Sequence, residues 1–544
     1  MIMNAMKGMM RKGMLLSAAA LAAITASAES VVIKNPGTFE NPVRDGYAVF
    51  PDTLYFDRDA EEITFPDMGA FVNLGDYDFP NLRKVVINNV DYMPGSSFWA
   101  MRNLEEIVVN GRVGHFDCVF AGGCPNLRKI VFNGPVSSTG GPSINYACPQ
   151  LEKVEFNGLV VNLGLELWPE DLTPGFRNYT VNGAVIKSDC DSVAPAGADE
   201  IRSNPRMMAQ MKELAKWQSE VLTASGDNRW MRKTAYEDAR TLLPMLDSLG
   251  CVATADSLRA AMDFAWNRGD EVKTMLDILK ESPAYAADTI KKPDFAYVLP
   301  SDSMLTATRL HFNLDSIAGT GSDVERIKNL LYWVHDNIRH DGNNGLPKGP
   351  RSLLNIYYSA RRDSCGWNCR ALAIALTEAL LAEGIPARYL TCESKKWDSD
   401  QDCHVICVAW SESLNKWIWV DPTFAAYIAD ENGLLLHPGE VRYRLQNDLP
   451  LVLNADANWN NEYFETKEDY LEDYMAKNLY IMSANLLNQA EPEGQSAHRQ
   501  GYAAALVPTG SNYSAAYVIT TDEDWFWQAP SEFRVSSEAR SGQI

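Results

Sequence analysis

Three residues in the second half of the chain have the types and the order that thiol acyl-transfer chemistry needs. Cys369 lies where the sequence predicts the first turn of a helix, His404 lies in an alternating apolar segment, and Asp421 follows another apolar run. In such a set the cysteine attacks, the histidine moves the proton and the aspartate fixes the tautomer of the histidine. The sequence therefore predicts attack on a carbonyl carbon and a thioester intermediate.

The predicted position of Cys369 favours its ionised form. A helix N-terminus and a nearby imidazolium both stabilise a thiolate, which is the reactive state of cysteine. The backbone N–H of Cys369 is expected to bind the oxyanion of the tetrahedral intermediate together with a second donor. Trp367, Asn344 and Tyr358 are the candidates for that donor.

A group of cysteines around the histidine raises the alternative of a zinc site. Cys365, Cys369, Cys403 and Cys407 together with His404 have the residue types of a metal cluster. On a strand, however, Cys403 and Cys407 lie on the face opposite His404, so one ion could not easily bind all of them. We therefore expect no metal and no cofactor.

Residues 366–425 resemble the transglutaminase-like superfamily through a set of linked motifs. The matching segments are Cys369 with Ala373 one turn later, Gly384-Ile385-Pro386-Ala387-Arg388, His404 at the head of a strand, and Trp417 followed by Asp421-Pro422-Thr423. The distance to Gly384 identifies Cys369, rather than Cys365, as the nucleophile of this pattern. The resemblance implies a papain-like α+β fold with Cys369, His404 and Asp421 as its triad.

Two departures from the animal transglutaminases favour hydrolysis over cross-linking. Asn368 precedes the cysteine where the animal enzymes carry glutamine, and their other domains have no recognisable counterpart here. Many bacterial relatives look like peptidases or amidases. The expected substrate is therefore a protein or peptide that carries a peptide or glutaminyl-type amide.

The elements that must position these residues follow from local patterns. Ser322 to Glu325 form a capping box that opens a helix, and the helix at Cys369 is expected to end at Gly384. Strands are predicted at 405–410 and 417–420, joined as a hairpin. The segment 463–487 is predicted to be helical.

An internal repeat occupies the first part of the chain. Segments of one leucine, an apolar strand core and a final asparagine recur in steps of 22, 23 and 24 residues, beginning at Asn81, Asn103, Asn126 and Gln150. One such strand cannot bury its own apolar face, so the copies are expected to stack as a solenoid over 45–185. The copies resemble the leucine-rich repeats of bacterial surface antigens. They would serve either to bind a protein or glycan ligand or as a spacer.

The sequence thus predicts a multidomain protein. A signal peptide is expected at 1–28, the leucine-rich-repeat solenoid at 45–185, a small helical connector at 196–290, and an α+β papain-like catalytic domain with a C-terminal extension at 300–530. The first of these combines basic residues, an apolar run and a small-residue cleavage site, so the protein is expected to be exported. No later segment is apolar for long enough to span a bilayer.

Composition narrows the function further. The formal net charge of −22 argues against binding to nucleic acid or to an anionic membrane. Two classes of function are left: a secreted cysteine hydrolase or acyltransferase, and a surface adhesion protein whose repeats bind a ligand while the catalytic domain is accessory or inactive.

Overall fold

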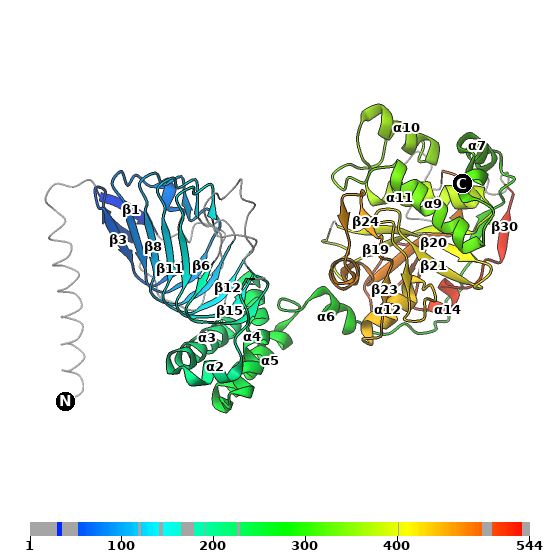
Figure 1. Cartoon of the computed structure of the whole chain (residues 1–544). Helices are drawn as coiled ribbons and strands as arrows, with labels where there is room; N and C mark the ends of the chain where they lie inside the picture. The colour runs from blue at the N-terminus through cyan, green and yellow to red at the C-terminus, as the bar shows by residue number, and fades with distance from the viewer. Residues whose placement is uncertain are drawn as a thin grey trace. The chain divides into compact units, whose positions relative to one another are not determined.

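The chain folds into two compact units, Met1–Val272 and Lys273–Ile544 (Figure 1). The computed structural model describes residues 30–34, 53–117, 121–140, 145–164, 179–190, 192–225, 229–400, 402–491 and 503–535. The predicted signal peptide at 1–28 lies outside the described residues. The boundary between the units falls inside 196–290, the range predicted to be a connector.

The first unit contains a solenoid of parallel strands, as the repeat predicts. One six-stranded sheet is made of β3 (Glu62–Phe65), β5 (Lys84–Ile87), β8 (Glu106–Val109), β11 (Lys129–Phe132), β14 (Lys153–Phe156) and β16 (Thr180–Val181). The second is made of β4 (Met68–Ala70), β6 (Val90–Met93), β9 (Val113–Phe116), β12 (Val136–Thr139), β15 (Leu159–Leu163) and β17 (Ala184–Ser188). The solenoid is confirmed, whereas its assignment to the leucine-rich class stays a prediction.

Asn-Gly pairs follow β8, β11, β14 and β16 and explain the register of this part of the solenoid. The Asn133 amide donates to Asn110 of the preceding turn at 3.0 Å, and Asn157 donates to Asn133 at 2.9 Å. The glycines that follow these asparagines are also in close contact between turns, since a Cβ on Gly134 would lie 2.0 Å from the carbonyl oxygen of Gly111. From β8 onward, neighbouring turns therefore hydrogen-bond through asparagine and approach each other closely at glycine.

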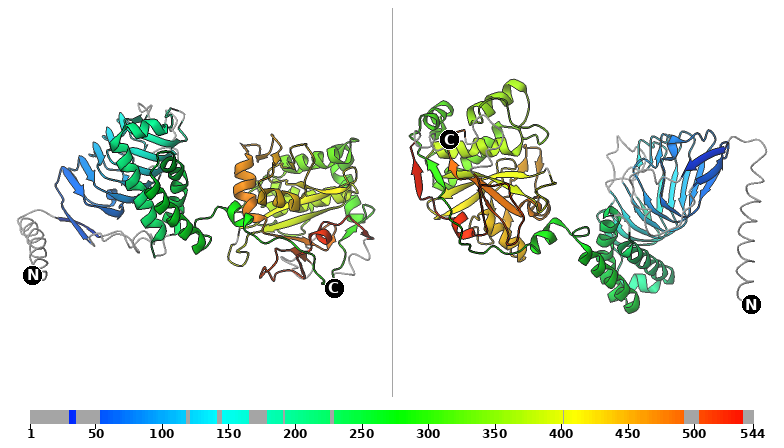
Figure 2. Two further views of the ribbon diagram at one scale, coloured as in Figure 1. Left: turned by 90° about the horizontal axis from the view of Figure 1, so that it is seen from below. Right: turned by 180° about the vertical axis from the view of Figure 1, so that it is seen from behind.

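Helices of the first unit cover the second sheet of the solenoid (Figure 2). They are α2 (Ala198–Ser203), α3 (Pro205–Thr223), α4 (Arg229–Ser248) and α5 (Val252–Arg268). Trp217 of α3 donates to the buried Asp91 of the sheet at 2.8 Å, and Ser137 donates to Asp238 of α4 at 2.7 Å. This helical region is thus packed on the solenoid rather than extended as a separate linker.

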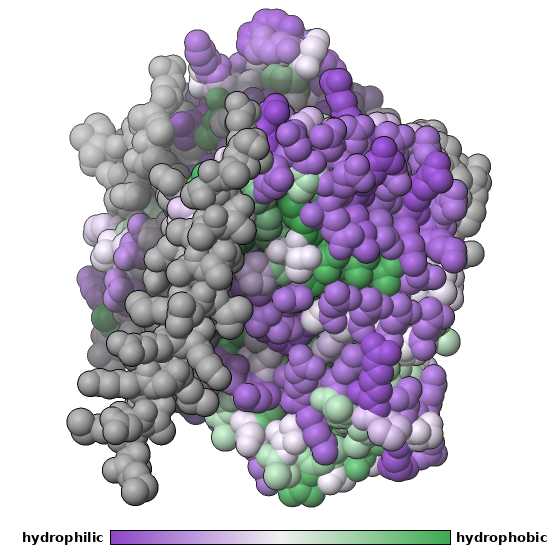
Figure 3. Space-filling view, turned by 90° about the vertical axis from the view of Figure 1, so that its left-hand side faces the viewer, coloured by the Kyte–Doolittle hydropathy of each residue, from purple (hydrophilic) through white to green (hydrophobic). Residues whose placement is uncertain are grey.

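The surface of the first unit agrees with the acidic, polar composition of the chain. Hydrophilic side chains prevail on the face that Figure 3 turns to the viewer. On the first sheet, Lys129 lies 3.3 Å from Glu155 and Lys84 lies 3.5 Å from Glu62, so ion pairs join neighbouring turns. No helix among the described residues is both long and apolar enough to cross a membrane.

The second unit is built on a six-stranded mixed sheet. Its order is β21 (Lys416–Val420), β20 (His404–Ser411), β19 (Ala387–Glu393), β26 (Ile481–Asn485), β28 (Ala503–Leu506) and β29 (Val518–Thr520). The predicted hairpin is present as β20 and β21, which pair antiparallel. The segment 463–487 is only partly helical, because its last third forms β26, which pairs with β19.

Helix α11 (Cys369–Ala382) packs against β19 and β20, and its residues from 371 to 382 are all buried. The buried Glu378 of this helix accepts hydrogen bonds from the Thr308 hydroxyl at 2.8 Å and the Leu353 N–H at 3.1 Å. Burial raises the pKa of Glu378 to about 7 even though these bonds lower it. Further helices, α7 (Ser303–Phe312), α9 (Asp323–Asn337) and α10 (Leu353–Asp363), complete this side of the unit.

A fully buried arginine joins the sheet to the C-terminal segment. The guanidinium of Arg388 on β19 lies over aromatic rings at 4.2 to 5.3 Å from their centres, those of Phe295, Trp417, Phe526 and Trp527. Its Nη2 donates to the backbone carbonyl of Phe526 at 2.7 Å. Cation–π contact therefore takes the place of a carboxylate partner here.

Candidate active site

Cys369 is the first residue of α11, as the sequence predicts. The preceding Asn368 caps the helix, with its side-chain oxygen accepting from the Ala371 N–H at 3.2 Å. N–H groups of a first helical turn have no acceptor within the helix and carry the positive end of its dipole. Cys369 as a residue is partly exposed, although burial of its thiol is the largest single influence on its pKa.

His404 opens β20 beside the nucleophile and is almost fully buried. Its Nε2 lies 2.7 Å from Oδ2 of Asp421. Its Nδ1 lies 3.3 Å from the hydroxyl of Tyr474, and a hydrogen bond links the imidazole to Cys369. Because Asp421 occupies Nε2, Nδ1 is the nitrogen left to exchange a proton at the sulfur.

Asp421 is completely buried at the end of β21. Its carboxylate accepts from His404, from the Tyr470 hydroxyl at 2.6 Å and from the Thr423 N–H at 2.9 Å. Burial raises the pKa of Asp421, but the charge of His404 and these hydrogen bonds outweigh burial and lower it. The carboxylate is therefore ionised and fixed in place.

The three groups stabilise a thiolate and an imidazolium together. Burial raises the pKa of Cys369, but hydrogen bonds from His340 and His404 and the charge of His404 outweigh it and lower the value to about 6. Burial lowers the pKa of His404, but Asp421 and the cysteine outweigh it and raise the value to about 10. Near neutral pH the pair is thus charged, which is the reactive state of a cysteine nucleophile.

The three side chains predicted as oxyanion donors have other hydrogen-bond partners. The Trp367 indole donates to the carbonyl of Ile356 at 3.2 Å. The Asn344 amide donates to Asp341 at 3.1 Å and to Gly366 at 3.0 Å, and the Tyr358 hydroxyl pairs with His311 at 2.8 Å. The structure therefore brings Cys369, His404 and Asp421 together and directs the donors of Trp367, Asn344 and Tyr358 elsewhere.

Three further residues contact the triad and were not predicted from the sequence. Tyr470 and Tyr474 lie in the π-helical segment η3 (Glu468–Met475), whose hydroxyls contact Asp421 and His404. The third residue is His340, which lies in a polar loop and lowers the pKa of Cys369 through a hydrogen bond. None of these residues belongs to a recognisable motif, and each reaches the site through a contact distant in sequence.

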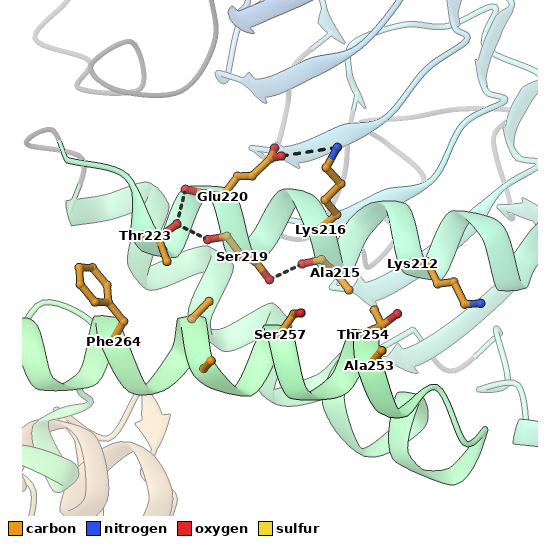
Figure 4. A pocket seen from close by; sticks show the side chains of 12 residues that line it. Lys212, Ala215, Lys216, Ser219, Glu220, Thr223, Ala253, Thr254, Ser257 and Phe264 are labelled. Carbon is orange, nitrogen blue, oxygen red and sulfur yellow. Dashed lines mark hydrogen bonds and ion pairs between the residues drawn. The ribbon is translucent and has the colours of Figure 1, made fainter.

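A separate groove of about 800 Å³ lies in the first unit, between α3 and α5 (Figure 4). Its lining is mostly apolar and includes Phe264, and the charged pair Lys216 and Glu220 lies along it with 3.7 Å between nitrogen and oxygen. The groove contains no member of the triad. Among the described residues, no group of three His, Cys, Asp or Glu side chains is arranged to hold a metal ion.

A family profile matches the part of the chain that contains this site. The profile of the family described as "Transglutaminase-like superfamily" matches residues 311–422, a range that includes Cys369, His404 and Asp421. No curated protein matches the chain. A solved structure described as a "putative cysteine protease" from Cytophaga hutchinsonii is 18% identical, over 24% of this chain and 40% of its own, with a TM-score of 0.17. The matched part thus spans two fifths of that protein. Residues 311–422 therefore belong to a transglutaminase-like domain, which lies in the second unit and follows a β-solenoid and a helical region.

Proposed function

We propose that this protein is an exported cysteine-dependent hydrolase that cleaves peptide or glutaminyl-type amides through a thioester on Cys369. The pairing of Cys369 with His404 supports this most strongly, because it provides a thiolate beside a proton donor near neutral pH. The match of residues 311–422 to the transglutaminase-like superfamily supports the same chemistry.

In the first half-reaction the Cys369 thiolate attacks the amide carbonyl carbon, and a C–S bond forms as the carbonyl oxygen becomes an oxyanion. The intermediate collapses by breaking the C–N bond, and the departing amine takes the proton from Nδ1 of His404. Asp421, hydrogen-bonded to Nε2, stabilises the imidazolium before this transfer. The products are a thioester and a free amine or ammonia.

In the second half-reaction a nucleophile resolves the thioester. Water gives up a proton to the neutral His404 and attacks the carbonyl carbon, and the C–S bond breaks to release the acid and the thiolate. A primary amine in place of water would give transamidation by the same steps. We favour water because Asn368 precedes the nucleophile where the animal cross-linking enzymes carry glutamine.

The test is to measure turnover of the full chain on glutaminyl and ordinary peptides, with and without hydroxylamine. Ammonia release and new peptide ends report hydrolysis, and a hydroxamate reports transamidation. Cys369→Ala is expected to abolish turnover, while Cys365→Ala, four positions earlier, is the matched control and should retain it. Equal turnover by wild type and Cys369→Ala would refute the proposal.

Export is proposed from the basic and apolar N-terminal pattern followed by Ala26-Ser27-Ala28. The test is the intact mass of the protein recovered from the producing bacterium. A mature chain that begins at Glu29 supports export, and a protein that keeps Met1 in the cytoplasm contradicts it.

A further inference from the structure

The chain segment around His340 is fixed beside the segment that leads into the nucleophile. His340 and Trp367 face each other across a parallel bridge, and on either side the Trp367 N–H donates to the Arg339 carbonyl at 2.9 Å while the Asp341 N–H donates to the Trp367 carbonyl at 2.8 Å. Gly366 permits this approach, because a Cβ there would lie 2.7 Å from the Arg339 oxygen. His340 is thus held next to a residue two positions before Cys369.

A hairpin distant in sequence holds the backbone of His340. It is formed by β24 (Asn458–Trp459) and β25 (Tyr463–Phe464). The side chain of Asn460 accepts from the His340 N–H at 2.8 Å and donates to the His340 carbonyl at 3.0 Å. Both polar groups of the His340 backbone are therefore bound by one amide.

The same hairpin fixes the tautomer of the imidazole. Nε1 of Trp459 donates to Nδ1 of His340 at 2.9 Å. An indole nitrogen can only donate, so Nδ1 must be the acceptor and a neutral imidazole must carry its proton on Nε2. His340 as a residue is partly exposed, as is Cys369.

The imidazole of His340 acts on the Cys369 thiol. Burial raises the pKa of Cys369, and the hydrogen bond with His340 is the largest of the contributions that lower it. Since Trp459 occupies Nδ1, Nε2 is the nitrogen left to donate to the sulfur, and in the neutral ring it carries the proton. A donor aimed at the thiolate also lies near the oxygen of a carbonyl carbon bonded to that sulfur.

We propose that His340 is the second oxyanion donor of the active site and that Trp459 is its positioning residue. In the resting state Nε2–H donates to the thiolate, and in the tetrahedral intermediate it donates to the oxyanion together with the Cys369 N–H. No proton leaves His340 in either state, so the acid–base work remains with His404. This inference deepens the proposed function and rests on it.

The test compares His340→Ala, His340→Gln and Trp459→Phe with wild type and with the control His311→Ala, which removes an exposed imidazole of the same unit. His340→Ala is expected to lower kcat by roughly 10²–10³ with little change in KM, as loss of one oxyanion donor does. His340→Gln keeps an N–H near the position of Nε2 and should recover at least tenfold. Trp459→Phe keeps the ring but not the donor, and should fall between wild type and His340→Ala.

A second measurement does not depend on a substrate. Iodoacetamide alkylation of Cys369 is followed against pH in the same variants, and the midpoint should rise in His340→Ala and return partly in His340→Gln. Turnover that needs Cys369 but is equal in His340→Ala refutes this inference and leaves the proposed function standing. If wild-type turnover does not need Cys369, the proposed function fails. The role of His340 is then decided by the pH midpoint of Cys369 alkylation alone. An unchanged midpoint in His340→Ala refutes that role.

Discussion

Replacing Asp421 by asparagine tests whether its charge activates the nucleophile through His404. Three donors converge on this carboxylate, from His404, Tyr470 and Thr423. An amide keeps the shape but removes the charge, and its NH₂ group must face one of these donors. The variant therefore separates charge from side-chain volume.

The size of the expected effect on Cys369 can be worked out from the pKa of His404. The pKa of His404 is about 10, against an ordinary value near 6.5. This difference corresponds to about 5 kcal/mol, and Asp421 supplies the largest of the raising contributions. If Asp421→Asn loses about half of this free energy, the His404 imidazolium is less stable by ~2 kcal/mol. Because the imidazolium and the Cys369 thiolate form one ion pair, we expect the pH midpoint of Cys369 alkylation to rise by about one unit.

The assay is alkylation of Cys369 by iodoacetamide between pH 5 and 10, read by peptide mass spectrometry. Wild type should reach half of its plateau rate near pH 6, and Asp421→Asn should react about fivefold more slowly at that pH. Asp402→Asn is the matched control, since its carboxylate lies two positions from His404 in sequence but is exposed and paired with Lys477. Superimposable profiles for wild type and Asp421→Asn would refute the reasoning.

Two further predictions concern stability. A carboxyl whose pKa is raised on folding costs stability as pH rises from its ordinary value, so Glu378 should lower the free energy of unfolding by about 3 kcal/mol between pH 4.5 and 7. Denaturant unfolding of Glu378→Gln should lose that slope, whereas the exposed Glu412→Gln should keep it, and an unchanged slope in the former would contradict the assignment. Gly134→Ala should destabilise the first unit by roughly 2–3 kcal/mol, because its Cβ meets the Gly111 carbonyl. Gly197→Ala, which meets nothing within 4 Å, is its control in thermal unfolding, and equal melting of the two variants would show that the glycine stack is not tight.

The parts of the structure that the sequence predicted well are those that depend on local sequence patterns. The solenoid follows from a repeated strand and its terminal Asn or Asn-Gly, and the structure shows Asn157 donating to Asn133 beside the stacked glycines. The helix at Cys369 and the hairpin that begins at His404 follow from an N-terminal cap and from alternation. The proximity of the three triad residues follows from these elements through the resemblance to a known family.

The parts that the sequence did not predict depend on contacts between distant segments. Strand β26 was predicted to be helical, because its apolar residues have no clear period of their own, and its pairing with β19 decides its conformation. The oxyanion candidates Trp367, Asn344 and Tyr358 lie upstream of Cys369, as His340 does, and no local pattern singles out His340. Trp459 and His340 are more than a hundred positions apart, and no local pattern relates them.

The aromatic enclosure of Arg388 sets an order of events during synthesis. The ribosome delivers the cysteine, the histidine and the aspartate well before Phe526 and Trp527, whose rings close over the guanidinium. Until those rings arrive, the cation on β19 needs water, and water cannot be excluded from that side of the sheet. A polypeptide that stops before Phe526 would carry every group needed for the chemistry on an unfinished core. Proteolysis of such products should therefore be fast, and activity should emerge only after translation has passed this point.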